Sequence, residues 1–302
     1  MEHRLEIQFR PLDELICSLH TYICRKSYKK IDLGAAWAER TRQRLAPELA
    51  DLLDRSEIDH LWKLTYLLVQ LCPAEEGEGF VDWLDQRSAG DLYELLAPYT
   101  QHFPESMGAF RDKTLKMFSR WQEQYFRDID PAILSSLRDE ARGRSDEQSE
   151  MAPKAFVDRA TNGLVFEPAP GFERLVLIPQ YHFQPVNVIY TFGGTTMCHY
   201  SAMITLDDED ALSTHAYRMI RSLAEKSRLK ILRYLHQGPR SFIEIHRHLQ
   251  LSKGITHDHI SKLRMAGMIH AHFEGENLTV YSLRDGALDQ MQRSLAAYIY
   301  QN

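Results

Sequence analysis

The C-terminal part of the chain contains an ordered run of helical segments, and this run limits the fold more than any other feature. Apolar residues recur at helical spacing over residues 224–235, and Gly238-Pro239 ends that helix. Ser241 can cap a second helix. A third is expected over Lys253–Ala266, closed by Gly267 as a helix C′ glycine would close it. The spacing therefore predicts three short helices in succession.

A β-hairpin is expected directly after the third helix. Residues 269–273 and 278–283 alternate in polarity around Glu274-Gly275-Glu276-Asn277, which has turn chemistry. A helix, a helix–turn–helix and a two-stranded wing together form the winged-helix arrangement.

Three segments in this region resemble the ArsR (arsenical-resistance repressor) superfamily of winged helices. The resemblance covers roughly the last 80 residues, and it is specific because three spaced motifs occur in the right order. It implies a DNA-binding transcription regulator, expected here to be a repressor. The segments are Leu223-Ala-Glu-Lys-Ser-Arg-Leu-Lys-Ile-Leu-Arg-Tyr-Leu235, Leu251-Ser-Lys-Gly-Ile-Thr-His-Asp-His-Ile-Ser-Lys-Leu-Arg-Met-Ala-Gly-Met-Ile269 and Val280-Tyr281-Ser282-Leu283.

The third helix is expected to enter the major groove of operator DNA. Lys253, Thr256 and Lys262 are candidates for phosphate contacts. His257 and Asp258 are candidates for reading base edges, although Asp258 can equally be an ordinary surface acid. The full set expected to contact DNA is Ser252, Lys253, Gly254, Thr256, His257, Asp258, Ser261, Lys262, Arg264 and Arg284.

The opposite face of this helix is expected to pack inward through Ile255, Ile260 and Leu263, with His259 in a packing role. The wing is a weaker candidate for DNA contact. Its turn is acidic, where many winged helices carry Arg or Lys, and Arg284 and His272 are the nearest basic side chains.

Charge divides the chain at about Leu212. Residues 212–302 contain 13 Lys and Arg against 7 Asp and Glu, a net charge of +6, whereas residues 1–211 carry −12. A basic segment that coincides with the winged-helix pattern favours nucleic-acid contact. We accordingly name double-stranded operator DNA as the expected partner.

A homodimer is expected because an apolar stripe on the last helix has no obvious partner within so small a domain. Helix 211–221 precedes the winged helix, and in the resembling family these two terminal helices form the dimer. The alternative is that both helices pack on the N-terminal domain. The stripe consists of Leu288, Met291, Leu295 and Tyr298.

The rest of the chain is expected to be mostly helical with a small sheet. Residues 4–9, 174–178, 186–190 and 195–200 have strand patterns, and the polar run 142–150 is expected to be an exposed loop. The expected fold class is mainly α (α+β), with a helical regulatory or sensor domain over residues 1–205 and the winged helix with its dimerisation helices over 206–302.

This N-terminal domain resembles, more weakly, a domain of unknown function fused ahead of ArsR-type winged helices. The resemblance implies a one-component regulator in which the first domain modulates the second, but it names no effector. An unknown small molecule is one option. The residues on which this weaker resemblance rests are Pro11–Leu19, Thr161–Gly163 and Leu175–Pro185. Aromatic residues that could line a pocket, or simply form core, are Phe126, Tyr181, Phe183, Tyr190, Trp62 and Trp83.

No metal or cofactor is expected. The cysteine and Asp–His positions of the family's metal sites have no counterpart here. Cys17, His20 and Cys24 share one helix face and could ligate zinc or copper(I), but packing as small buried side chains is the better reading.

An enzyme is not expected either, because common catalytic motifs such as GxSxG, the P-loop and HExxH are missing. Cys198 and His199 are adjacent on a strand, so they face opposite sides. The chain has no apolar run of membrane-spanning length and only 4 cysteines, so a cytoplasmic protein is expected. The alternative function is a small-molecule or metal-binding protein that uses its winged helix as a protein-interaction module.

Overall fold

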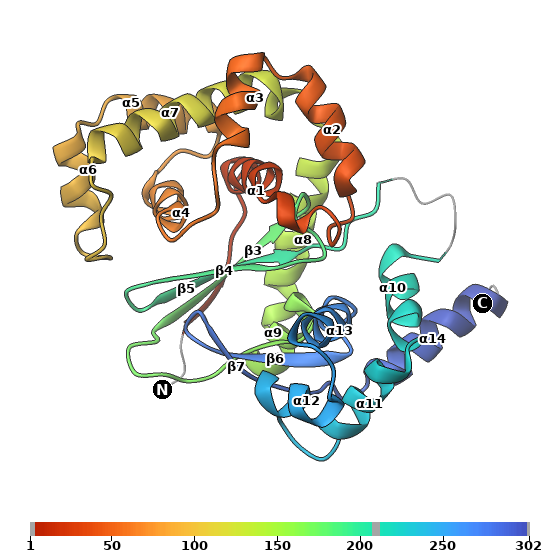
Figure 1. Ribbon diagram of the computed structural model, residues 1–302. Coiled ribbons are helices and arrows are strands. Elements are labelled where there is room, and N and C mark those ends of the chain that lie inside the picture. The colour runs from red at the N-terminus through yellow and green to blue at the C-terminus, as the bar shows by residue number, and fades with distance from the viewer. Residues whose placement is uncertain (1–3, 207–211, 301–302) are drawn as a thin grey trace. The chain divides into compact units, whose positions relative to one another are not determined.

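The computed structural model describes residues 4–206 and 212–300, and the chain divides into two compact units (Figure 1). We call Glu2–Ser145 with Gly171–Ala202 the N-terminal unit, and Asp146–Pro170 with Met203–Asn302 the C-terminal unit. The chain therefore crosses between the units three times. Each unit is described separately below.

A four-stranded mixed sheet lies in the N-terminal unit. Its strand order is β1 (Arg4–Ile7), β3 (Arg174–Gln180), β5 (Thr195–Ser201) and β4 (Val188–Phe192). β1 and β3 are parallel, β3 and β5 are parallel, and β4 is antiparallel to β5. β3 and β5 are almost wholly buried, and β3 is accordingly apolar from Leu175 to Pro179, whereas β5 also buries polar side chains such as Thr196 and His199.

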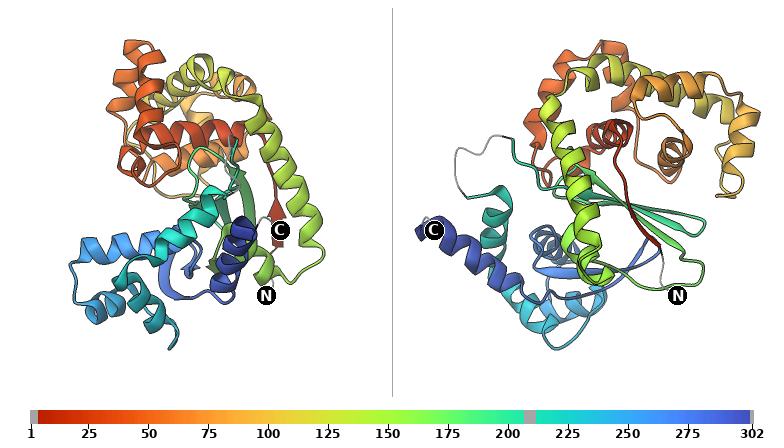
Figure 2. Two further views of the ribbon diagram at one scale, coloured as in Figure 1. Left: turned by 90° about the vertical axis from the view of Figure 1, so that its right-hand side faces the viewer. Right: turned by 180° about the vertical axis from the view of Figure 1, so that it is seen from behind.

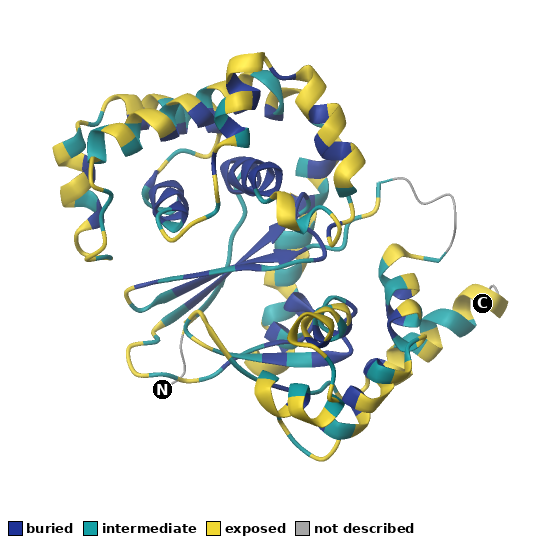
Figure 3. Cartoon of the chain, in the orientation of Figure 1, coloured by how far each residue is buried: buried dark blue, intermediate teal, exposed yellow. Residues whose placement is uncertain are grey.

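Helices cover this sheet, and α1 forms the centre of the unit. Every residue of α1 is buried, and Figure 3 shows α1 and α4 dark along almost their whole length. Pro11 occupies the first helical turn, where a missing N–H costs nothing. The helices of the unit are α1 (Pro11–Ile23), α2 (Gly34–Arg44), α3 (Pro47–Asp54), α4 (Trp62–Leu71), α5 (Gly77–Asp85), α6 (Ala89–Leu96), α7 (Met107–Gln124) and most of α8 (Pro131–Gln148), with short 3₁₀ turns at Arg25–Ser27 and Phe126–Asp128.

α8 corrects one expectation. The polar run that begins at residue 142 was expected to form a loop, but α8 continues as a helix to Gln148 (Figure 2). Arg144 Nε lies 2.7 Å from Glu140 Oε1, one helical turn away. Oppositely charged side chains of α8 are thus paired along the helix. Polar residues without an apolar stripe can thus remain helical when such pairs support them.

The C-terminal unit is built on a three-stranded sheet, β2 (Leu164–Phe166), β6 (Ile269–Glu274) and β7 (Asn277–Leu283). β6 and β7 form the antiparallel hairpin expected for the wing. β2 pairs in parallel with β6, with Leu164 opposite Ala271 and Phe166 opposite Phe273. The helices of the unit are α9 (Pro153–Thr161), α10 (Thr214–Leu223), α11 (Lys226–Leu235), α12 (Phe242–Leu249), α13 (Lys253–Met265) and α14 (Ala287–Tyr300).

The expected fold class is confirmed: the fold is α+β and mainly helical, with a C-terminal winged helix. The division of the chain differs from the expected one. The last crossing, between Ala202 and Met203, lies close to residue 205, but residues 146–170 belong with the winged helix. The reason is that β2 pairs with β6 of the wing and that Asp158 of α9 contacts His270 of the same strand.

Candidate nucleic-acid interface

Side-chain caps fix where each helix of the helix–turn–helix begins. Glu225 accepts a hydrogen bond from the Ser227 N–H at the start of α11. Ser241 and Glu244 form a capping box on α12. Ser252 Oγ accepts from the Ile255 N–H and starts α13. The local sequence therefore sets the register of the recognition helix.

α13 buries a face that differs by one residue from the expected one. Thr256, Ile260 and Leu263 are inward, with exposures of 0%, 3% and 0%. Thr256 donates its hydroxyl hydrogen to the Ser252 carbonyl at 3.0 Å. The prediction that Thr256 contacts phosphate is therefore wrong, and so is the inward placement of Ile255, which is 48% exposed.

The exposed face of α13 retains the basic and short side chains that a groove-reading helix needs. Lys253, Gly254, His257, Asp258 and Lys262 are all exposed. Lys262 Nζ lies 2.7 Å from Asp258 Oδ2, one turn away, so the acid on this face is paired. Both partners are about half exposed, and a pair of this kind holds its members only weakly. The Lys262 ammonium is therefore held only weakly by Asp258.

Two further expected residues have other roles in this structure. Ser252 is the cap of α13, so its hydroxyl already has a partner. Ser261 is only partly exposed, on the border between the buried and exposed faces. Both remain candidates at the edge of the interface.

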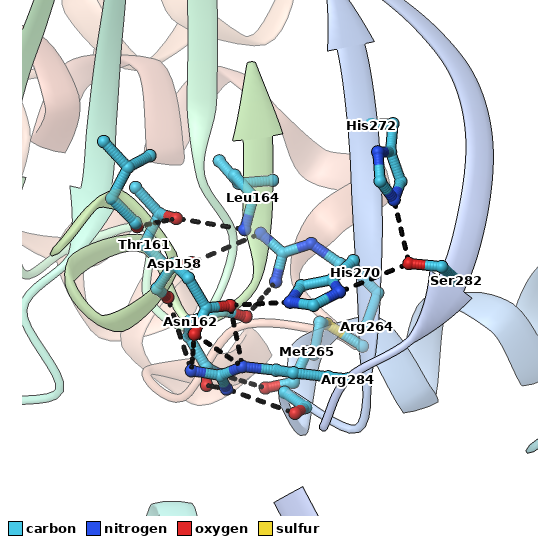
Figure 4. Close-up of polar contacts among 12 residues, drawn as sticks. Asp158, Thr161, Asn162, Leu164, Arg264, Met265, His270, His272, Ser282 and Arg284 are labelled. Atoms are coloured by element: carbon cyan, nitrogen blue, oxygen red, sulfur yellow. Dashed lines mark hydrogen bonds and ion pairs between the residues drawn. The ribbon is translucent and has the colours of Figure 1, made fainter. Parts of the chain in front are cut away.

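Arg284 lies in a polar cluster within the unit and not on a DNA-facing surface (Figure 4). Its Nε and Nη2 donate to Asp158 of α9 at 2.9 and 3.0 Å, and its Nη1 donates to Asn162 Oδ1 at 2.7 Å. The side chain is 9% exposed. A bidentate, largely buried guanidinium is not available for DNA, so the expectation for Arg284 is wrong.

Arg264 has a similar structural role at the end of α9. Its guanidinium donates to the Asn162 carbonyl at 3.0 Å and to the Thr161 carbonyl at 3.4 Å. These carbonyls end a helix, where unsatisfied acceptors carry partial negative charge. Arg264 thus joins the recognition helix to α9, and the expected DNA contact is not supported. The sequence contained no local signal for this because the partners lie more than 100 positions away.

The wing is acidic at its tip, as expected. Glu274 and Glu276 are exposed there. His272, one of the two basic candidates near the wing, is partly buried with its Nδ1 2.8 Å from Glu167 Oε1. With Arg284 also engaged, neither named side chain is free to insert into a minor groove.

The expected dimerisation stripe is partly exposed. Leu288 is 50% and Tyr298 36% exposed, whereas Met291 and Leu295 are partly buried. α10 and α14 pack against each other within the unit. Tyr217 of α10 is also 51% exposed, so apolar surface remains on both helices of this pair.

The metal candidates in the N-terminal unit have local partners. Cys17 Sγ lies 3.2 Å from His199 Nδ1, and Cys24 Sγ lies 3.2 Å from Ser27 Oγ. His20 Nδ1 faces the Tyr190 hydroxyl at 3.5 Å. Within residues 4–206 and 212–300, no three His, Cys, Asp or Glu side chains are grouped so that they could hold a metal ion.

Sequence reasoning missed the pairing of Cys17 with His199. Burial raises the pKa of the Cys17 thiol well above its usual value, and the Glu14 carboxylate adds to this. Burial also lowers the pKa of His199 to about 3, helped by the charges of His20 and Arg10. Thiol and imidazole are therefore both neutral. Strand β5 brings His199 inward, but no sequence pattern indicates that it meets α1 there.

Comparison with known families supports the assignment of this region. Residues 225–271 match the family model described as bacterial regulatory protein, ArsR family. The match spans α11, α12, α13 and the start of β6, so this segment is an ArsR-type helix–turn–helix domain, of a kind found in DNA-binding transcription regulators. No curated protein and no solved structure matches the chain. Among the helices that the structure describes, none is both long and apolar enough to cross a membrane.

Proposed function

We propose that the protein is a homodimeric transcription repressor that binds operator DNA through α13. The observation that carries this proposal is the exposed face of α13, with Lys253, Gly254, His257 and Lys262, in a segment that matches the ArsR family. A helix with basic and hydrogen-bonding side chains on its free face can contact phosphates and base edges in the major groove.

Net charge gives weaker support than the sequence alone suggested. Residues 212–302 carry +6, but residues 146–170 and 203–211, which belong to the same unit, contribute 9 acidic and 2 basic side chains. The net charge of the unit is −1. The proposal therefore depends on the local face of α13 and not on a strongly basic domain.

Binding to a labelled duplex from the region upstream of the protein's own gene tests the proposal. The double variant Lys253→Ala, His257→Ala removes two exposed groups from α13. We expect it to bind roughly tenfold or more weakly, because one phosphate or base contact is worth about 1–3 kcal/mol. Arg293→Ala, which removes one exposed charge from α14, is the matched control. Equal affinity of the native chain and the double variant would favour a protein-interaction role for the winged helix.

The dimer is proposed to form through α10 and α14. The support is the apolar surface left on this helix pair, including Tyr217 and Leu288. A two-fold dimer presents two recognition helices to half-sites about one helical turn apart. The molecular masses of the native protein and of the Leu288→Glu variant, measured by analytical ultracentrifugation, test whether this dimer forms. A native dimer and a monomeric variant support it, whereas a native monomer at micromolar concentration contradicts it.

Modulation by the N-terminal unit is proposed to reach the DNA-binding unit through the chain crossings. α8 is one helix whose residues are shared between the two units, and α9 and β2 follow it directly. If the C-terminal unit has two conformations that differ in operator affinity, a ligand bound to the N-terminal unit can favour one of them and so change that affinity. A thermal-shift screen of small molecules tests for an effector: a ligand that both stabilises the chain and alters operator affinity supports this mechanism.

We further propose that the protein works in the cytoplasm without a cofactor and is not an enzyme. The Cys17–His199 contact offers no activated nucleophile, because a neutral thiol is a poor nucleophile.

A further inference from the structure

Two histidines of the wing hold the segment that contains α9 and β2. His270 Nε2 lies 2.9 Å from Asp158 Oδ1, and His272 Nδ1 lies 2.8 Å from Glu167 Oε1. Both histidines are on β6, and both carboxylates belong to residues 153–167, outside the part that matches the ArsR family. The two contacts therefore attach this additional segment to the wing.

The second nitrogen of each ring faces the same hydroxyl group. Ser282 Oγ of β7 lies 3.2 Å from His270 Nδ1 and 2.8 Å from His272 Nε2 (Figure 4). The cluster is thus a chain of five groups in which Ser282 is the centre and the two carboxylates are the ends.

The groups around each carboxyl at the ends of the cluster determine which atoms donate there. Burial alone would raise the pKa of Asp158, but hydrogen bonds from His270 and Arg284, with their charges, outweigh it and lower the pKa of this carboxyl. Asp158 is therefore ionised at neutral pH, and its oxygens only accept hydrogen bonds. The contact of Glu167 with His272 is of the same kind, between a carboxyl oxygen and a ring nitrogen. Each ring must then donate from the nitrogen that faces its carboxylate.

When both histidine rings are neutral, the five groups of the cluster have one hydrogen fewer than they have contacts. A neutral imidazole that donates from one nitrogen only accepts at the other. Ser282 has a single hydroxyl proton, so it can donate to His270 or to His272 but not to both. One ring nitrogen would then face an oxygen at 2.8 or 3.2 Å with no hydrogen between them.

We propose that the His270–Ser282–His272 cluster binds one additional proton, and that this proton fastens α9 and β2 to the wing. With it, His272 donates from Nε2 to Ser282, which donates to the Nδ1 of His270, or the same sequence runs in the opposite direction. Each of the four contacts in the cluster then has one hydrogen. Loss of the proton leaves an acceptor facing an acceptor and weakens the attachment, so the device responds to pH.

The other charged groups around the pair do not supply this hydrogen. The guanidinium of Arg284 is directed at Asp158 and Asn162, and that of Arg264 at the end of α9. On α10, burial together with the charges of Arg218 and Arg284 lowers the pKa of His215 to about 4, so it is neutral at physiological pH. The extra proton thus belongs to the two wing histidines.

Long-range ¹H–¹⁵N spectra of the full chain labelled with ¹⁵N-histidine test the proposal directly, without DNA. Signals are assigned with His270→Gln and His272→Gln. At pH 7.5 we expect one of the two rings to carry a proton on both nitrogens. Two neutral rings, or two doubly protonated rings, would overturn the proposal.

Two serine variants test whether Ser282 shares the proton. Ser282→Thr keeps the hydroxyl and is expected to keep one charged ring, whereas Ser282→Ala is expected to leave both rings neutral at pH 7.5. A charged ring that persists in Ser282→Ala would show that the carboxylates alone hold it, contrary to the proposal.

Amide hydrogen exchange tests the consequence for the attached segment. Protection factors, which remove the intrinsic pH dependence of exchange, are measured for residues 164–166 from pH 7 to 9. We expect protection to fall by up to tenfold per pH unit once the proton is lost, and to be nearly flat in Ser282→Ala. The same profile in both proteins would overturn the coupling to α9 and β2.

Discussion

His20 and His199 show how single residues in the core of the N-terminal unit determine its response to acid. The ring of His20 packs against Trp62, Tyr66 and Phe183, and burial lowers the pKa of His20 to about 3. The pKa of His199 is lowered to the same value, chiefly by burial. Both rings are therefore neutral in the folded chain and take up protons when it unfolds in weak acid.

We expect the N-terminal unit to lose stability as the pH falls below about 6.5, the usual pKa of histidine. Because the folded pKa is depressed, the unfolded state binds more protons there, and the free energy of unfolding falls by roughly 2 kcal/mol per histidine at pH 5. His199→Gln should reduce this slope, and exposed His60→Gln should not. All four tryptophans lie in the N-terminal unit, so tryptophan fluorescence during urea unfolding measures it selectively. Identical slopes in native chain and His199→Gln would contradict this assignment.

Arg284 carries a structural role at the same scale. Arg284→Lys keeps the charge but loses the bidentate contact with Asp158, so we expect the C-terminal unit to lose about 2 kcal/mol of stability. The measurement is hydrogen exchange over residues 153–167 and 267–284, which should become faster. Arg293→Lys on the exposed side of α14 is the control. If Arg284→Lys weakened DNA binding with unchanged exchange, a direct DNA contact would be the better explanation.

At the scale of elements, α13 shows what a sequence can predict and where the prediction stops. Its end followed from Gly267, because a C′ glycine is a local signal. Its start is also fixed locally, by the Ser252 cap. Its buried face was predicted one position out of phase. Hydrophobicity selected Ile255, but the helical register places Thr256 on the same face as Ile260 and Leu263. A threonine that satisfies its hydroxyl within the helix can replace an apolar side chain there.

α9 and β2 show the opposite case, in which no local signal was available. Their attachment depends on Arg264, Arg284 and the two wing histidines, whose partners are more than 100 positions away. A single sequence does not contain the pairing of a three-residue strand with β6. The wing hairpin was predictable because its strands are joined by a short turn.

The cap of α13 allows the structural and DNA-binding roles of Ser252 to be separated. Ser252→Ala should destabilise α13 by about 1 kcal/mol. Ser252→Asp retains a good cap, so it should keep the fold, but its charge should repel a nearby phosphate and lower operator affinity. Circular dichroism melting and DNA binding measured on both variants distinguish the roles. Unchanged affinity in a folded Ser252→Asp chain would place this helix terminus away from the phosphates.

At the scale of the whole molecule, the division into the N-terminal and C-terminal units does not follow the order of the sequence. Residues 146–170 precede three strands of the N-terminal unit, β3, β4 and β5, yet complete the sheet of the C-terminal unit. The smallest independent form of the DNA-binding unit should therefore be discontinuous in sequence. A fragment beginning at residue 212 leaves the edge of β6 unpaired and the guanidinium of Arg284 without Asp158.

We expect fragment 212–302 to be markedly less stable than a chain in which residues 146–170 are joined to 203–302 by a Gly/Ser linker replacing residues 171–202. The joined chain restores β2 beside β6 and both arginine contacts with α9. Thermal melting by circular dichroism compares the two, and Asp158→Ala in the joined chain is the matched control, which should lose much of the gain. Equal melting of fragment and joined chain would mean that the winged helix folds without its inserted segment. A stable joined chain would also allow nonspecific DNA binding to be compared with the full chain as salt increases, because only charges near the phosphates alter the salt slope.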